Sequence, residues 1–197
     1  MSSKDRIARQ KEDTRNSILE ASYAIVKEEG WNGLNMRKIA DRIEYTAPII
    51  YEYFANKDAI IKELASQSFI NLHKKLILAK DKFENPKDQL KSMWMAYWDF
   101  AVENTEMYQV MYGVEMNCSG RECSTVENTY NLFITAIMEV MKDKNPSYEV
   151  VKQKYYTFYS VIHGLVSINI TNKNAVSDEI NIGVLNDAIG GIINTLE

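Results

Sequence analysis

Polar side chains that can hold a phosphate or a base edge gather in one short stretch, between Asn35 and Lys57. Arg37 carries a planar guanidinium fork that fits guanine O6 and N7 or a phosphate. Thr46 offers a hydroxyl and precedes a predicted helix whose first amides can bind an anion. Tyr51 can donate its phenolic hydroxyl to a backbone oxygen. These residue types favour contact with nucleic acid.

Two short helical patterns must position these side chains. The first has the i, i+3, i+4, i+7 spacing of one apolar helix face, at Met36, Ile39, Ala40 and Ile43. The second has an apolar inner side at Ala47, Ile50 and Phe54. Asn35 and Thr46 stand as N-caps, and Pro48 lies in the first turn of the second helix. Because only Glu44 and Tyr45 separate the helices, the pattern predicts a helix-turn-helix whose second helix can enter a DNA major groove.

The composition favours an all-helical globular protein. The 197 residues are 46% hydrophobic and 25% charged, with only 8 glycines and 3 prolines. The chain carries no apolar run of transmembrane length, and its first residues have no apolar core typical of a secretory signal. Cys118 and Cys123 are too few for a disulfide framework, so a cytoplasmic protein is expected. We interpret them as two free thiols, and a thiol switch has no further support in the sequence.

The net charge of −4 argues against a nucleic-acid binder only if charge is spread evenly. Residues 1–60 hold ten basic and ten acidic residues, so this part of the chain is neutral. Phosphate contacts are local, and a neutral domain binds DNA when its cations face one way. The expected consequence is weak non-specific affinity.

Helical periodicity divides the chain into about nine helices. They are expected over residues 14–29, 36–43, 47–54, 57–80, 86–105, 106–112, 125–141, 150–170 and 178–196. We predict a DNA-binding helix-turn-helix domain of three helices at 1–56. A larger helical bundle at 57–197 is predicted to bind a ligand and form the dimer. No repeat or low-complexity linker is present.

The N-terminal part resembles the TetR family of bacterial transcriptional regulators. The matching residues are Thr14, Ala21, Gly30, Ile39, Ala40, Ile43, Thr46, Tyr51, Tyr53, Phe54 and Lys57. The stretches at 106–112 (EMYQVMY) and 159–168 (YSVIHGLVSI) are similar to a C-terminal ligand-domain type with a His-Gly motif. Ile162 departs from that motif, which has an aromatic residue there. Glu44 departs from the usual glycine of the turn, where positive φ costs a non-glycine residue about 1 kcal/mol.

The resemblance implies a set of DNA contacts. They are Asn35, Arg37, Thr46, Ala47, Pro48, Ile49, Tyr51, Tyr53 and Lys57. The alternatives are ordinary packing for the two tyrosines and solvated surface charges for Arg37 and Lys57. Ala47, Pro48 and Ile49 can touch thymine methyl groups but donate no hydrogen bond. Specificity is therefore expected to depend on Arg37, Tyr51, methyl contacts and DNA shape. One short helix reads few bases, which predicts a two-fold dimer on a pseudo-palindrome.

The last two helices are predicted to form the dimer contact as a four-helix interface. The apolar stripe assigned to it consists of Leu185, Ala188, Ile189, Ile192 and Leu196. Gly190 and Gly191 stand mid-helix, where glycine is tolerated if another backbone comes close, and Gly164 is expected to act likewise. The alternative is packing of this stripe within one chain.

A surplus of aromatic and thioether side chains predicts an apolar pocket with a few polar groups. The candidate ligand residues are Trp94, Tyr97, Trp98, Tyr108, Met111, Tyr130, Phe133, Tyr156, Tyr159 and His163. For each of them, core packing is the alternative. His163 is either a core histidine whose hydrogen bonds are made within the chain or a polar group of the pocket.

Together these features predict a dimeric regulator, a repressor that a small hydrophobic or aromatic effector releases from a palindromic operator. No metal or cofactor is expected, because the sequence has no cluster of ligating residues. Two alternatives remain: an architectural DNA-binding dimer without ligand, and an all-helical enzyme using His163 and tyrosines. No carboxylate–histidine pair or nucleophile motif supports the enzyme. The effector, the operator and the sign of regulation do not follow from the sequence.

Overall fold

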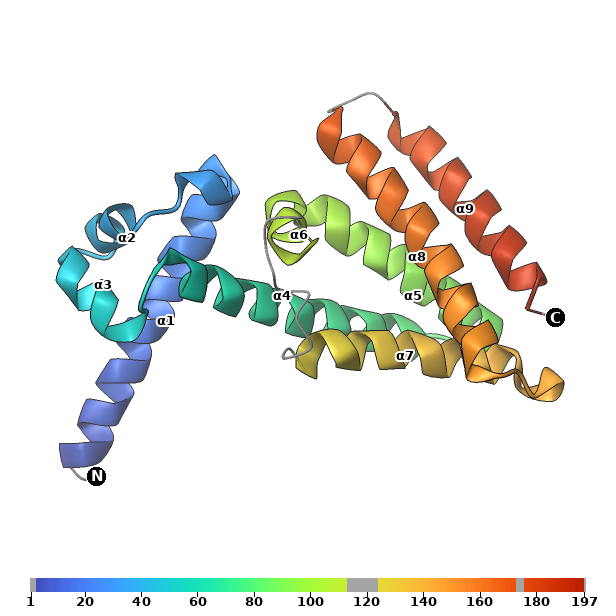
Figure 1. Ribbon diagram of the computed structural model, residues 1–197, viewed down its shortest axis with the longest axis horizontal. Coiled ribbons are helices and arrows are strands. Elements are labelled where there is room, and N and C mark those ends of the chain that lie inside the picture. The colour runs from blue at the N-terminus through green and yellow to red at the C-terminus, as the bar shows by residue number, and fades with distance from the viewer. Residues whose placement is uncertain (1–2, 113–123, 173–175, 197) are drawn as a thin grey trace. The chain divides into compact units, whose positions relative to one another are not determined.

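The computed structural model describes residues 3–112, 124–172 and 176–196 (Figure 1). These residues contain nine α-helices and no β-strand, which confirms the all-α prediction. The helices are α1 (Ser3–Glu29), α2 (Met36–Arg42), α3 (Ala47–Tyr53), α4 (Lys57–Lys80), α5 (Pro86–Glu103), α6 (Thr105–Tyr112), α7 (Ser124–Val140), α8 (Tyr148–Thr171) and α9 (Asp178–Asn194). Among them, none is both long enough and apolar enough to cross a bilayer.

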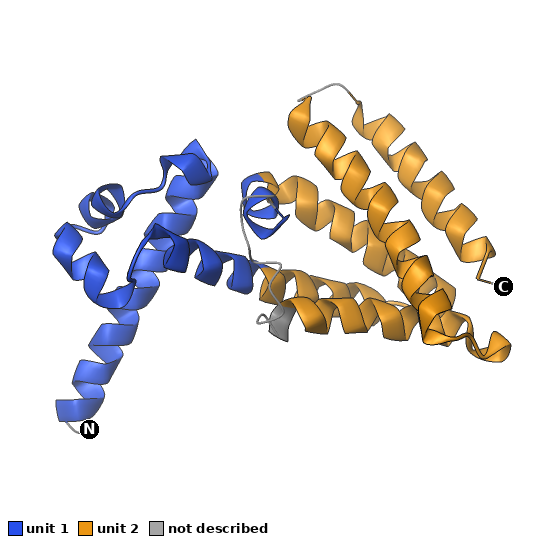
Figure 2. Ribbon diagram, viewed as in Figure 1, with its two compact units in different colours: residues 1–68, 106–120 blue, residues 69–105, 121–197 orange. Residues whose placement is uncertain are grey.

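The chain forms two compact units, coloured separately in Figure 2. Unit 1 comprises residues 1–68 and 106–120, and unit 2 comprises residues 69–105 and 121–197. Helix α4 begins in unit 1 and ends in unit 2, and α6 belongs to unit 1 although it follows α5 of unit 2. The predicted functional boundary between 56 and 57 stays a prediction, since compact units and functional domains are different divisions.

Unit 1 has one continuous apolar core. Helix α1 contributes Ile18, Ala21 and Ile25 at helical spacing, and α3 contributes Ile50. Helix α6 adds Met107 and Val110, which brings a segment distant in sequence into the core of the helix-turn-helix. This core holds α2 and α3 at a fixed angle to α1 and thereby decides which face of α3 meets solvent.

Helix α1 begins at Ser3, earlier than the start predicted at Thr14. Residues 3–13 are all exposed, so no buried stripe marks them as helical in the sequence. At its other end α1 stops as predicted, because Gly30 adopts φ 74° just beyond the last helical residue. The 3₁₀ turn η1 (Trp31–Gly33) then leads the chain into α2.

The predicted N-cap positions are confirmed, but only two of the three side chains form a capping hydrogen bond. Asn35 Oδ1 accepts a hydrogen bond from the Lys38 amide at 3.0 Å and so caps α2. Thr46 occupies the N-cap position of α3, but its side chain makes no capping hydrogen bond. Asn56 Oδ1 accepts from the Ala59 amide at 2.9 Å and caps α4. Between α2 and α3, Glu44 has φ 58°, which confirms the strained conformation expected where glycine is usual.

The strain at Glu44 can be tested by measuring the free energy of unfolding of variants at this position. Glu44→Gly is expected to stabilise the chain by about 1 kcal/mol, because glycine adopts positive φ without a Cβ clash. Glu44→Ala is the matched control: it removes the same carboxylate but keeps the Cβ, and should give no such gain. Urea denaturation followed by circular dichroism measures both. Equal stability of the two variants would contradict strain at this turn.

Unit 2 is a helical bundle built around α5. Helix α5 packs against α7, α8 and α9, and α8 also packs against α7 and α9. The second half of α4 joins the bundle through an ion pair between Lys75 and Glu103 at 2.6 Å. Helices α8 and α9 run side by side (Figure 1), and a reciprocal amide pair joins them: each of Asn169 and Asn181 donates Nδ2–H to the other's Oδ1 at 3.0 Å. Because Asn181 is buried, this pair fixes the register of the two helices.

Candidate DNA-binding surface and helical bundle

Helix α3 has one buried side and one exposed side. Ile50 is fully buried in the unit 1 core, which fixes the rotation of the helix. Thr46, Pro48 and Tyr51 are exposed, and the Tyr51 side chain is 55% exposed. A large aromatic residue this open on a short helix is available to a partner rather than to the core. The exposed side of α3 is therefore the face that a DNA groove would meet.

Arg37 differs from the other cations of α2. Arg42 makes a bidentate pair with Glu28, at 2.9 Å and 2.5 Å, which lowers the pKa of that carboxyl through hydrogen bonding. Lys38 pairs with Glu29. Arg37 is exposed and, among the residues the structure describes, makes no ion pair. Its guanidinium is thus the α2 cation available for a phosphate or a guanine.

Other predicted contact residues are engaged in packing. Ala47 and Tyr53 pack against the unit 1 core, and Ile49 is half-buried. The Lys57 ammonium lies over the Trp31 ring, 5.3 Å from its centroid, so a cation–π contact holds it. The Asn35 side chain is occupied in capping α2. These residues shape the surface and its local charge, while their side chains are less available to bases.

Glu52 is a surface residue that the sequence reasoning did not single out. It is exposed next to Tyr51 on α3 and is the one charged side chain within that helix. A carboxylate in a major groove can accept a hydrogen bond from cytosine N4. In the sequence, Glu52 stands two positions after Ile50, which puts it on the opposite side of the helix from that inward-facing residue. This spacing was the signal that could have identified Glu52 as a surface residue.

The aromatic cluster of unit 2 centres on Trp94 of α5. Its ring stacks on Phe133 at 3.9 Å between centroids and on Phe158 at 5.3 Å, with interplanar angles of 20° and 17°. Tyr97 meets it edge-on at 5.8 Å. Along α8, the rings of Tyr155, Tyr159 and His163 stack in succession, at 5.9 Å and 5.1 Å. Parallel rings from three helices thus form one interior of flat apolar surfaces.

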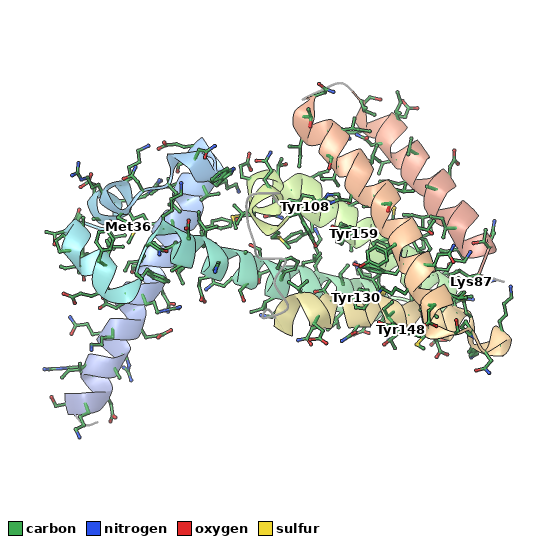
Figure 3. The ribbon with its side chains drawn as sticks, viewed as in Figure 1. Met36, Lys87, Tyr108, Tyr130, Tyr148 and Tyr159 are labelled. Atoms are coloured by element: carbon green, nitrogen blue, oxygen red, sulfur yellow. The ribbon has the colours of Figure 1, made fainter. Side chains whose placement is uncertain are left out.

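Hydroxyl and imidazole groups border this cluster. Tyr130 of α7 and Tyr148 of α8, labelled in Figure 3, place their hydroxyl oxygens 3.1 Å apart. Burial raises the pKa of Tyr159 to about 12 and also raises that of Tyr130, so both phenols stay protonated at neutral pH. Burial lowers the pKa of His163, which favours the neutral imidazole. The cluster is therefore polar in places but uncharged.

The predicted ligand residues do not all lie in one unit. Eight belong to unit 2, whereas Tyr108 and Met111 are buried on α6 of unit 1. Within unit 2, Tyr156 is 49% exposed and borders the cluster from outside. Trp98 is buried on α5. Cys118 and Cys123 lie outside the described residues.

Two family models match successive parts of the chain. A family model described as bacterial regulatory proteins, tetR family, matches residues 18–64. A second model, described as a tetracyclin repressor-like C-terminal domain, matches residues 90–180. Together the two models cover well over half of the chain. The chain belongs to the TetR family.

Named relatives of this TetR-family chain are regulators of transcription. An uncharacterized HTH-type transcriptional regulator of Haemophilus influenzae is 32% identical over 94 residues, which are 48% of this chain and 50% of that protein. The HTH-type transcriptional repressor KstR2 of Mycobacterium tuberculosis is 29% identical over 108 residues, 55% of this chain and 54% of the repressor. The chain spans about half the length of the curated relatives it matches.

Solved TetR-like structures share the fold over nearly the whole chain. The fatty acid degradation regulator FadR from Bacillus halodurans aligns with a TM-score of 0.70 at 13% identity, over 92% of this chain and 93% of that chain. The ketosteroid transcriptional regulator KstR2 of Mycobacterium tuberculosis aligns with a TM-score of 0.60 at 18% identity, over 90% and 94%. At these identities the likeness shows the fold alone.

The stripe assigned to the TetR-type dimer contact is used mostly inside the chain. Leu185, Ile189 and Leu196 are buried in unit 2, so they offer a second chain no surface. Ala188 and Ile192 are half-buried at the edge of this stripe. The periodicity correctly marked an apolar face of α9, but that face covers the bundle's own core.

Proposed function

We propose that this TetR-family chain is a cytoplasmic repressor that binds a palindromic operator as a homodimer and leaves it when a small hydrophobic effector binds. The observation that carries the proposal is the exposed face of α3, where Tyr51 is open to solvent, together with Arg37 on the preceding helix, which makes no ion pair in the part of the chain that the structure describes. The names of its relatives support repression, since KstR2 is a repressor. Two relatives of known structure are named as a fatty acid degradation regulator and a ketosteroid regulator, which supports a hydrophobic effector.

Recognition of the operator combines few direct contacts with DNA shape. Arg37 donates to a guanine or a phosphate, and Tyr51 donates its hydroxyl to the DNA backbone or a base edge. Pro48 is exposed at the start of α3 and meets a thymine methyl group. With so few donors, the deformability of the DNA supplies the remaining specificity.

The dimer contact lies on the outer flanks of α8 and α9. Lys154 donates to Thr195 Oγ1 at 2.8 Å, so these flanks adjoin. Helical spacing places apolar and small residues beside this hydrogen bond on both helices: Val150, Thr157, Val161, Gly164 and Ile168 on α8, and Ile180, Val184, Ala188 and Gly191 on α9. A Cβ built on Gly164 or Gly191 meets no atom within 4 Å, so their own chain does not require glycine there. A second chain packing closely on this flank would explain both glycines.

The effector acts on the bundle of unit 2, and two helices carry the effect to the helix-turn-helix, which is the reading head of each chain. Helix α4 runs without a break from unit 1 into unit 2. Helix α6 follows α5 directly and inserts Met107 and Val110 into the core beneath the helix-turn-helix. A shift of α5 on binding therefore reaches α3 through packed side chains and changes the spacing of the two reading heads.

Selection of DNA from a random duplex library tests the proposal. The purified chain is expected to enrich an inverted repeat whose half-sites are centred about one helical turn or more apart. Thymine should recur where the exposed face of α3 meets the groove. Failure to enrich any sequence, or enrichment of an unsymmetrical single site, would refute a dimeric operator-binding regulator.

A further inference from the structure

Trp94 has a buried donor without an acceptor. Its side chain is 0% exposed, and within the described residues its Nε1 has no hydrogen-bond partner. Burying an N–H without an acceptor is unfavourable, and such groups are rare in folded proteins. The neighbouring rings of Phe133, Phe158 and Tyr97 fill the surroundings with apolar surface. An acceptor from outside the chain would satisfy this donor.

Among the described residues, the same interior has no buried charged side chain to offer a ligand. The buried polar residues described in unit 2 are Thr129 and Asn181, and Asn181 is already paired with Asn169. His163 sits at the end of the α8 stack, where burial favours its neutral form. A carboxylate entering this cluster would lose its hydration without meeting a cation, which is strongly unfavourable.

We propose that the effector is an uncharged, largely apolar compound whose carbonyl-type oxygen accepts the hydrogen bond of Trp94 Nε1. Phe133 and Phe158 already stack on Trp94, so an entering compound would meet this ring at its Nε1 edge rather than on its faces. The acceptor follows from the unpartnered donor, and neutrality follows from the absence of a buried cation among the described residues of the bundle. This inference rests on the proposed function, which places the effector in unit 2.

Three naphthalene probes of nearly the same shape separate these requirements. 2-Acetylnaphthalene carries a ketone, 2-isopropenylnaphthalene replaces its oxygen with a methylene group, and 2-naphthoate replaces the methyl ketone with a carboxylate. Isothermal titration calorimetry on the full chain is expected to show the ketone binding about tenfold more tightly than the alkene, the effect of one hydrogen bond. The carboxylate should bind most weakly.

Variants then assign the difference to one atom. Trp94→Phe keeps an aromatic ring but lacks the N–H, so the tenfold preference for ketone over alkene should vanish. Trp31→Phe, the same change in unit 1, should preserve it. If Trp94→Phe fails to fold, the indole ¹H–¹⁵N signal of Trp94 in the unaltered chain, assigned by elimination with Trp31→Phe and Trp98→Phe, is expected to move downfield with the ketone only.

Several outcomes would overturn the inference. Equal affinity for ketone and alkene, tightest binding of the carboxylate, or no binding of any probe at its solubility limit would each contradict it. So would an unchanged preference in folded Trp94→Phe. If these ligand tests fail but the chain still enriches an inverted repeat, its proposed DNA-binding role remains. Failure to enrich any sequence would contradict the proposed function itself.

Discussion

Replacing Arg37 and Tyr51 together with alanine is expected to weaken operator binding on the order of a hundredfold or more. Each dimer loses two guanidinium contacts and two hydroxyl contacts, and a good bidentate contact to a base is worth about 1–3 kcal/mol. Both side chains are exposed, and Arg37 makes no ion pair within the described residues, so the fold should be unaffected. Fluorescence anisotropy with the selected operator measures the loss.

The control for this double variant is Lys91→Ala. Lys91 is exposed on α5 in unit 2, so its removal changes the net charge by the same amount without altering the reading head. Its operator affinity should stay within about twofold of the unaltered chain. If Arg37→Ala with Tyr51→Ala binds the operator as tightly as this control, the contacts have been assigned to the wrong residues.

Charging the outer flank of α9 is expected to separate the dimer into single chains. Val184→Glu with Ala188→Glu puts two carboxylates per chain on a flank that the proposal buries, and unpaired buried charge is strongly unfavourable. Val184 is 41% exposed in the single chain, so the bundle itself can accept the change. Light scattering after size-exclusion chromatography should report the mass of one chain, and operator affinity should fall because one reading head binds alone.

Asn186→Glu serves as the matched control for the interface. Asn186 is exposed on the same helix, but helical spacing sets it on the opposite flank from Val184. It should remain a dimer. A dimer that persists in Val184→Glu with Ala188→Glu would move the interface away from this flank. Leu185 and Ile189 are unsuitable for such a test because they are buried, and charging them would unfold the bundle.

Local signals made the helix-turn-helix readable from the sequence. The cap at Asn35, the inward side of α3 at Ile50 and the positive φ of Glu44 each depend on residues close in the chain. The fold class followed from periodicity, which is equally local. The exposed start of α1 at Ser3 was missed because a helix without a buried side leaves no periodic pattern.

The candidate sites depended on contacts that periodicity does not encode. An apolar stripe shows that a helix face is covered, but Leu185 and Ile189 could be covered by their own chain or by another. The Lys57 ammonium over Trp31 joins residues from two different elements, and spacing alone does not reveal that contact. The unpartnered Trp94 Nε1 likewise emerges only when every neighbour of the ring is placed. Composition indicated an aromatic interior, while its geometry required the fold.

Photocrosslinking measures the entry of α3 into the major groove most directly. In 5-bromodeoxyuridine the halogen takes the place of the thymine methyl group, so light joins that base to the side chain beside it. Trypsin cleaves after Arg42 and Lys57, which releases α3 within one peptide, residues 43–57. We expect the selected operator, substituted at a half-site thymine, to be joined to this peptide, at Pro48, Ile49 or Tyr51. Crosslinks confined to peptides of unit 2 would show that α3 does not read the operator.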